Sequence, residues 1–295
     1  MLHLQSLAPV VLLLWGFCVM PLSILLAARF GLVDVADARK THTGAVPRGG
    51  GIALWTGMMF WCLVFAPNSP LIPYAMTGGT IVFFAGYLDD MKSLSPFTRL
   101  AAHFFAAGVG LLGLYATGVQ TTALGYCVAI LWIAGSTNAY NFIDGMNGLS
   151  LSMTIISAAV MGAIGLGYWS WSLAALALGC LPWNFPKART FMGDGGVYLV
   201  GYFIGLLQAS GTLNWLRALW AIPVLLCLGG LPTLDTIRVA LGRIVKGHSP
   251  FYPDRTHLHH LFLDRGVSPL RTLGLCITIQ IVFGVLAWGL YELFA

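Results

Sequence analysis

Long apolar segments separated by short polar stretches constrain this chain more than any other feature. A bilayer core about 30 Å thick requires roughly 20 apolar residues in a helix. Ten segments approach that length, at residues 7–28, 49–66, 71–88, 100–117, 122–137, 149–167, 168–184, 196–211, 218–240 and 271–294. Only 8% of the residues are charged, against about 25% in soluble domains. The sequence predicts an all-α polytopic transmembrane bundle of about ten helices, forming one integral membrane domain over residues 1–295.

The charged residues gather on one side of this predicted bundle. With ten spans both termini lie on one face, and the polar segments 29–48, 89–99, 138–148, 185–195 and 241–270 lie on the other. All acidic residues except Glu292, and all Lys and Arg except Arg217, fall in these segments or at the adjoining helix ends. The positive-inside rule places that face in the cytoplasm and the termini in the periplasm. This bias explains the net charge of +5, and no basic cluster interleaved with aromatics indicates nucleic-acid binding.

The first polar segment combines basic residues with a run of glycines. It contains Lys40, His42 and Arg48, and glycines 49–51 then open the next helix. Glycine lets the backbone approach a ligand closely, and a helix N-terminus beside an arginine attracts anions. A positive-inside anchor explains the same residues, so both interpretations stay open.

Two adjacent carboxylates, Asp89 and Asp90, follow the segment at 71–88. Adjacent helix residues point about 100° apart, so one can face a metal while the other faces a second substrate. A stop-transfer signal would more naturally consist of Lys or Arg. A functional role is therefore favoured.

Polar residues recur every three positions at the end of the segment at 122–137. They are Asn138, Asn141, Asp144 and Asn147, and this spacing brings successive side chains together on a helix surface. Leaving all four unpaired would be costly, and helix capping explains one Asn but hardly the whole set.

An acidic residue between glycines, Asp194, precedes the segment at 196–211. Alone it would be an ordinary helix cap. It shares the predicted cytoplasmic face with Asp89, Asp90 and Asn141, and oxygen ligands of this kind suit Mg²⁺.

The last polar segment predicts a short interfacial helix begun by Pro253 and ended by Gly266. An apolar stripe of Leu258, Leu261 and Phe262 is expected on one side, and His257, His259 and His260 on the other. The H-x-H-H spacing lacks the i, i+4 pair and the glutamate of a zincin, which favours phosphate donors over zinc. A lone His103 is expected to pack in the core, and Asp235 to pair with Arg238.

Four motifs together resemble those of the polyprenyl-phosphate N-acetylhexosamine-1-phosphate transferases, the superfamily that includes phospho-muramoyl-pentapeptide transferase. They are LDD at 88–90, N-x-x-N-x-x-D-G-x-x-G-L at 138–149, FMGD at 191–194 and PDRTHLHH at 253–260. The resemblance extends over residues 31–268 and implies a cytoplasmic-face active site in the bacterial inner membrane.

The resemblance implies that a UDP-N-acetylhexosamine, most simply UDP-GlcNAc, transfers its sugar 1-phosphate to undecaprenyl phosphate. UMP is released, and a lipid-linked cell-envelope glycan such as O-antigen is begun. It implies that Asp194 and Asn141 hold Mg²⁺, with Mn²⁺ as an alternative. The expected catalytic residues are Asp89, Asp90, Asp194 and His257. The expected substrate-binding residues are Lys40, His42, Arg48, Arg99, Asn138, Asp144, Asn147, Arg255, His259 and His260.

Three other functions compete with this one. Phospho-MurNAc-pentapeptide transferase is a second branch of the same superfamily, although the H-x-H-H run resembles the GlcNAc branch more. A transporter would also carry intramembrane carboxylates, but it calls for ionisable groups near mid-bilayer and often for repeats. A CDP-alcohol phosphatidyltransferase needs a D-G-x-x-A-R run, whereas Asp144-Gly145 is followed by Met146-Asn147-Gly148. Membrane lipid is an expected partner, and a homodimer is left open.

Overall fold

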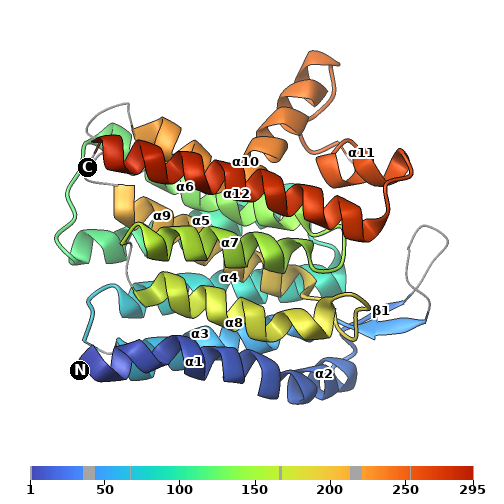
Figure 1. Ribbon diagram of the computed structural model, residues 1–295, viewed down its shortest axis with the longest axis horizontal. Coiled ribbons are helices and arrows are strands. Elements are labelled where there is room, and N and C mark those ends of the chain that lie inside the picture. The colour runs from blue at the N-terminus through green and yellow to red at the C-terminus, as the bar shows by residue number, and fades with distance from the viewer. Residues whose placement is uncertain are drawn as a thin grey trace.

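The structure is a computed structural model that describes residues 2–35, 44–66, 68–165, 168–212, 221–252 and 254–294. These residues form helices and one small antiparallel sheet (Figure 1). The helices are α1 Leu2–Cys18, α2 Met20–Arg29, α3 Gly50–Phe65, α4 Ile72–Lys92, α5 Pro96–Ala116, α6 Ala123–Ile143, α7 Leu149–Ala163, α8 Tyr168–Asn184, α9 Gly193–Thr212, α10 Ala221–Val245, α11 Leu258–Asp264 and α12 Pro269–Phe294. The strands are β1 Val33–Val35 and β2 Ala45–Pro47. Each predicted apolar segment contains helix, so the helical membrane fold is confirmed.

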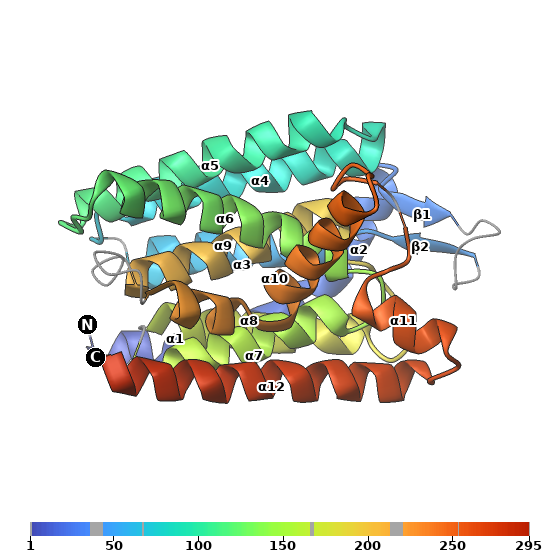
Figure 2. The same cartoon turned by 90° about the horizontal axis from the view of Figure 1, so that it is seen from above.

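The long helices run side by side, and the polar segments gather at one end of the bundle. Both termini lie at one end, and the β1–β2 hairpin and α11 lie at the other, in both views (Figures 1 and 2). This arrangement agrees with the even number of spans expected from the sequence. It places the polar motifs together at the rim opposite the termini.

Helix α9 lies at the centre of the bundle, where it packs against α3, α4, α5, α6, α7 and α10. Its residues from Gly195 to Ala209 are buried. A Cβ on Gly201 would lie 2.7 Å from Thr137 Cα, and one on Gly205 would lie 2.9 Å from Ile133 Cα. Small residues permit such close approach in membrane bundles. The central helix is thus held in register with α6, and it begins at the rim with Asp194.

Length and composition alone identify fewer membrane spans than the ten predicted. Among the described residues, α5, α10 and α12 are long and apolar enough, and the bent pair α1–α2 adds a fourth. Helices α3 and α7 are apolar but shorter. Polar residues such as Asp89 and Asp90 dilute the apolar character of others, including α4. The count of ten stays a prediction.

The first predicted span, 7–28, consists of two helices that meet at an angle of 43°. Pro21 lies in the first turn of α2, and a proline ring clashes with the carbonyl four residues earlier. The sequence showed one continuous apolar run, and the proline divides it.

The hairpin is a departure from the all-α expectation. Strand β1 pairs with β2 so that Asp34 faces Val46, and the Arg48 N–H donates to the Leu32 carbonyl at 2.9 Å. The hairpin therefore fixes the spacing between Asp34 and Arg48, which meet in the site described next.

Candidate active site

Carboxylates from separate segments converge at the polar rim. They are Asp34 on β1, Asp89 and Asp90 at the end of α4, Asp144 after α6 and Asp194 in the first turn of α9. The interactions of Arg48 and Asp90 join several of these segments, as the following contacts show. The sequence prediction that LDD, FMGD and the Asp144 segment share one face is consistent with this geometry.

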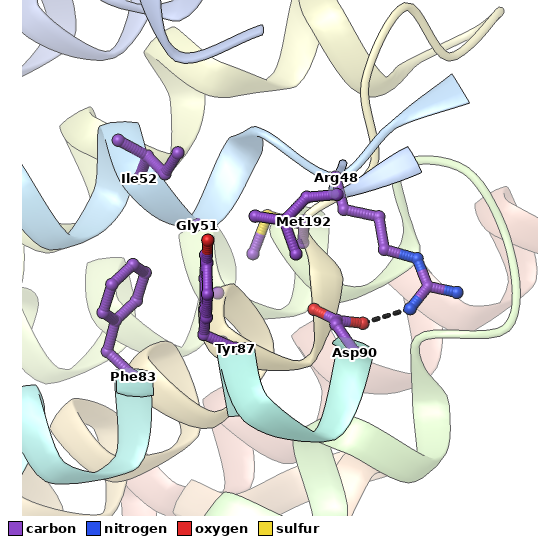
Figure 3. A pocket seen from close by; sticks show the side chains of 10 residues that line it. Arg48, Gly51, Ile52, Phe83, Tyr87, Asp90 and Met192 are labelled. Carbon is purple, nitrogen blue, oxygen red and sulfur yellow. Dashed lines mark hydrogen bonds and ion pairs between the residues drawn. The ribbon is translucent and has the colours of Figure 1, made fainter. Parts of the chain in front are cut away.

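Asp90 links the hairpin to the start of α9. Its Oδ1 accepts a hydrogen bond from Arg48 Nη1 (Figure 3), and its Oδ2 accepts one from the Asp194 N–H at 2.9 Å. Arg48 Nη2 in turn donates to Asp34 Oδ1 at 2.6 Å. Gly193, with φ of 67°, leaves room for Asp90, since a Cβ there would lie 2.6 Å from Asp90 Oδ2. Arg48, expected to bind substrate, is engaged by two carboxylates.

Asp89 is held by three donors. The Leu94 N–H donates to its Oδ1 at 2.7 Å, while Tyr198 Oη at 2.8 Å and Arg99 Nη1 at 3.2 Å donate to its Oδ2. The sequence analysis missed Tyr198. Its signal was its spacing, four residues after Asp194 on the same helix face. Arg99 pairs with Asp89, and its expected place along the diphosphate stays a prediction.

The glycine run at 49–51 serves helix packing, which corrects the prediction of a ligand-facing backbone. The N–H groups of Gly50 and Gly51 donate to the carbonyls of Phe191 and Met192 at 2.9 Å, and the Gly49 N–H donates to Thr190 Oγ1 at 2.9 Å. A Cβ on Gly51 would lie 2.7 Å from Gly196 N. These donors at the α3 N-terminus are therefore occupied by the segment before α9, and they are not available to an anion.

A small pocket lies beside the Arg48–Asp90 pair, between α3, α4 and α9 (Figure 3). Phe83, Ile52 and Met192 line its apolar part. The pocket therefore lies where the apolar interior meets the charged rim.

Two asparagines of the predicted series, Asn138 and Asn147, form hydrogen bonds within the protein. Asn138 Nδ2 lies 2.8 Å from His103 Nδ1 and donates to the Ala134 carbonyl at 3.0 Å. This internal pairing confirms His103 as a packed core histidine, and the substrate contact of Asn138 stays a prediction. Asn147 Nδ2 donates to the Pro186 carbonyl at 3.2 Å. Asn141 is half-buried at the end of α6, and its role as a metal ligand stays a prediction.

Burial and mutual repulsion raise the pKa values of the rim carboxylates. The pKa of Asp144 is raised to about 7, chiefly by burial and also by the charge of Asp90, while the charge of Arg48 opposes the rise. Burial raises the pKa of Asp194 well above its usual value, and Asp90 and Asp89 add to this rise. Neither carboxylate forms an ion pair within the described part of the chain.

That excess of negative charge fits a divalent cation. Among the described residues, no group of three or more His, Cys, Asp or Glu side chains forms a metal cluster. Mg²⁺, however, needs only one or two carboxylates together with amide oxygens, water and phosphates. Asp194, Asn141 and their neighbours are of this chemical type, so the residues present are compatible with the predicted ion.

The histidine run differs from the predicted amphipathic helix. Helix α11 begins only at Leu258, after His257, and Pro253 lies outside the described residues. His257 and His259 are buried. His257 Nδ1 lies 2.9 Å from Asp235 Oδ2, a partner that sequence analysis had assigned only to Arg238. The Asp235–Arg238 pair is confirmed at 2.6 Å.

His259 is directed at the Asp144 segment. A Cβ on Gly145 would lie 2.4 Å from His259 Nε2, and that nitrogen is buried and lacks a hydrogen-bond partner in the described part of the structure. The pKa of His259 is lowered to about 3, chiefly by burial and also by the nearby His260 and His257. Burial also lowers the pKa of His260. Both rings are neutral at pH 7, so each offers one N–H donor and no positive charge.

Three predicted substrate-binding residues remain. Arg255 forms an exposed ion pair with Asp264 at 2.7 Å, and its charge acts on the neighbouring His259 and His260. Lys40 and His42 fall outside the described residues.

Asp144 is expected to make the metal-free protein less stable as pH rises. Its pKa is about 7 in the folded protein and near 3.8 in an ordinary aspartate, so folding favours the protonated form. The stabilising effect is complete below pH 4 and disappears as pH rises through 7. Because one pKa unit is worth about 1.4 kcal/mol, the loss is at most about 4 kcal/mol. Thermal unfolding in EDTA at pH 5 and pH 8 measures the larger part of this loss, about 3 kcal/mol.

Asp144→Asn serves as the control for this prediction, since it keeps the shape and removes the titration. The variant should show a smaller fall in unfolding temperature between pH 5 and pH 8. Equal falls in both proteins would contradict the role assigned to Asp144.

Comparison with known proteins agrees with the grouping of motifs at the rim. Residues 72–212 match the family model described as Glycosyl transferase family 4. That region contains Asp89, Asp90, Asn141, Asp144 and Asp194. The match therefore includes most of the rim carboxylates.

Relatives resemble the chain over nearly its whole length. It is 29% identical to the probable undecaprenyl-phosphate N-acetylglucosaminyl 1-phosphate transferase of Bacillus subtilis, over 94% of this chain and 82% of the relative. It is 30% identical to the decaprenyl-phosphate N-acetylglucosaminephosphotransferase of Mycolicibacterium smegmatis, over 90% of this chain and 76% of the relative. It is 28% identical to the undecaprenyl-phosphate alpha-N-acetylglucosaminyl 1-phosphate transferase of Thermotoga maritima, over 88% and 82%. With the family match at its centre and these relatives along its length, the chain belongs to glycosyl transferase family 4.

Proposed function

We propose that this protein transfers N-acetylglucosamine 1-phosphate from UDP-GlcNAc to a polyprenyl phosphate, such as undecaprenyl phosphate, and releases UMP. The observation that carries the proposal is the convergence of Asp89, Asp90, Asp144 and Asp194 at one rim of a membrane bundle. The relatives named as GlcNAc-1-phosphate transferases are similar in sequence to this chain over most of its length. A lipid-linked cell-envelope glycan is the class of product.

The reaction brings two anions together. A phosphate oxygen of the lipid attacks the β-phosphorus of the UDP-sugar, the bond from that phosphorus to the UMP oxygen breaks, and UMP leaves with the electron pair. A phosphate monoester has a second pKa of about 6, so the lipid phosphate is already mostly dianionic at pH 7. Repulsion, more than deprotonation, is the main barrier to be lowered.

Asp194 and Asn141 would hold Mg²⁺, or Mn²⁺ in its place. When bound, the ion neutralises charge on the diphosphate and helps to align it. Asp90 fixes the backbone at Asp194 through the hydrogen bond to its N–H. Asp89, held by Tyr198, Arg99 and the Leu94 N–H, orients the neighbouring end of α4. In this scheme the two adjacent carboxylates act through position and charge, and neither serves as a general base.

The histidines of this run provide hydrogen-bond donors beside the diphosphate. His257 is oriented by Asp235, as expected for a ring that must present its other nitrogen to a ligand. His259 extends toward the Asp144 segment. Donors fixed in place before the substrate arrives stabilise developing phosphate charge without reorganisation.

We place the protein in the bacterial inner membrane with the site facing the cytoplasm and both termini in the periplasm. The concentration of Lys and Arg at the rim supports this orientation. UDP-sugars are charged and water-soluble, so the site must open to an aqueous compartment. A homodimer stays a prediction.

The decisive experiment measures UMP release by the purified protein from a panel of UDP-sugars, with and without undecaprenyl phosphate and Mg²⁺. We expect release with UDP-GlcNAc only when lipid phosphate and the divalent ion are both present. Consumption of UDP-MurNAc-pentapeptide instead would indicate the other branch of the superfamily. Substrate flux into vesicles without UMP release would indicate a transporter.

A further inference from the structure

Helix α10 is broken at Gly230, where φ is 52° and ψ is −141°. Only glycine readily adopts this conformation, and a Cβ there would lie 2.4 Å from Gln280 Oε1. Pro232 follows the break and lacks the N–H that would help to continue the helix. The break divides α10 into a first half inside the bundle and a second half that reaches the rim (Figures 1 and 2).

Two glutamines from other helices satisfy the backbone groups beside the break. The Leu231 N–H donates to Gln280 Oε1 of α12 at 2.8 Å. The Leu228 carbonyl accepts from Gln208 Nε2 of α9 at 2.8 Å. A membrane interior has no water to bind such groups, so broken helices persist there only where neighbouring side chains bind them.

Each glutamine is itself buried and fixed at its other end. Gln208 and Gln280 are 0% and 1% exposed. Trp132 Nε1 donates to Gln208 Oε1 at 2.8 Å, and Gln280 Nε2 donates to Ser157 Oγ at 3.0 Å. Two bound ends give each amide one orientation. The pair therefore specifies both the existence of the break and its geometry.

The second half of α10 carries the residues that hold the histidine run. Asp235 Oδ2 accepts from the Leu258 N–H at 3.1 Å and lies 2.9 Å from His257 Nδ1. Arg238 Nη2 donates to the Thr256 carbonyl at 2.6 Å. These contacts tie the start of α11 to α10 just beyond the break. A change in the break angle would therefore move His257 and His259.

We propose that Gln280 and Gln208 are positioning residues for transfer, acting through Asp235 to place His257 and His259 at the rim. The inference rests on the proposed function, because it assigns the histidines to substrate. It adds residues that are buried among the membrane helices and lie outside the sequence motifs. Gln280 has the larger role, since it binds the N–H beside the break and excludes any side chain at position 230.

A double-mutant cycle tests the route of action. Gln280→Leu preserves approximate size and removes the acceptor, and we expect it to lower kcat for UMP release about tenfold or more. In a background that carries both His257→Ala and His259→Ala the same change should cost less than about twofold, because both residues through which it acts are gone. An equal loss in both backgrounds would overturn the proposal and indicate general destabilisation.

A second readout does not depend on activity. Spin labels on unnatural amino acids at exposed Val245 and Leu275 report the distance from the end of α10 to α12. Gln280→Leu should shift or broaden this distance distribution. Tyr202→Phe, which removes a buried hydroxyl lacking a partner in the described part of the structure, should leave it unchanged. An unchanged distribution in Gln280→Leu would overturn the proposal.

Gln208→Leu offers a second variant if Gln280→Leu does not fold. It leaves the Leu228 carbonyl without its donor and Trp132 Nε1 without its acceptor, and the same two measurements apply with the same expected directions. Absence of UMP release by the unmodified protein would defeat the proposed function, whereas the distance measurement would still test the role of the glutamines.

Discussion

Asp194→Asn is expected to lower the rate of sugar-phosphate transfer by about 10³-fold. Asp194 lies at the start of α9 among Asp89, Asp90 and Asp144, and its pKa is raised by burial and by its acidic neighbours. A bound divalent ion would remove this repulsion and would be worth several kcal/mol to the transition state. About 4 kcal/mol corresponds to roughly 10³-fold in rate. Only the side chain changes, so the hydrogen bond from the Asp194 N–H to Asp90 is retained.

The same variant should alter metal binding independently of turnover. In the unmodified protein Mg²⁺ should raise the unfolding temperature, because an ion that binds only the folded state stabilises it. Asp194→Asn should lose most of this shift while its metal-free stability is equal or higher, since one repelling charge has gone. Glu292→Gln removes an equal charge at the opposite end of the bundle and should change neither quantity. Full activity in Asp194→Asn would contradict the assignment.

The apolar pattern predicted the helices because burial in a bilayer demands length and hydrophobicity, which sequence displays directly. It did not predict the bends. The bend before α2 depends on one proline within an otherwise apolar run. The break at Gly230 depends on Gln280, 50 residues further along the chain. The break at Gly230 depends on a residue of another helix. The hydrophobic pattern of one segment carries no information about such a partner.

The sequence placed the rim motifs on one face, but it predicted few of the contacts that join them. The glycines at 49–51 looked like a ligand loop, yet they allow α3 to contact the start of α9. Both uses require the absence of a Cβ, so sequence cannot separate them. Arg48 and Arg99 were expected to bind substrate, and the sequence did not show that both are paired with carboxylates. Composition indicates which charges are present, whereas their pairing depends on the fold.

Arg48→Gln is expected to lower transfer about 10²-fold at pH 7, and part of the activity should return at higher pH. Arg48 joins Asp34 and Asp90, and removing one partner of a buried pair costs about 3–5 kcal/mol. The lower end of that range applies, because the Arg48 side chain is 27% exposed. We expect the loss to fall on the alignment of the transition state, through the contact of Asp90 with the start of α9, and about 3 kcal/mol there corresponds to roughly 10²-fold in rate. The pKa of Asp90 is already raised by burial, and the Arg48 charge lowers it.

Without that charge the pKa of Asp90 rises further, and a larger fraction of Asp90 is protonated at pH 7. A protonated Asp90 is a weaker acceptor for the Asp194 N–H, which loosens the start of α9. Raising the pH ionises Asp90 again, so the ratio of variant to unmodified rates of UMP release should increase between pH 6 and pH 9. Arg48→Lys should retain more activity than Arg48→Gln, since it keeps the charge but lacks the two-armed geometry that reaches both carboxylates. Arg271→Gln, an equal charge change at an exposed position of α12, should give an unchanged profile. A loss in Arg48→Gln that is equal at every pH, with no advantage for lysine, would mean that Arg48 contacts substrate directly and does not act through Asp90.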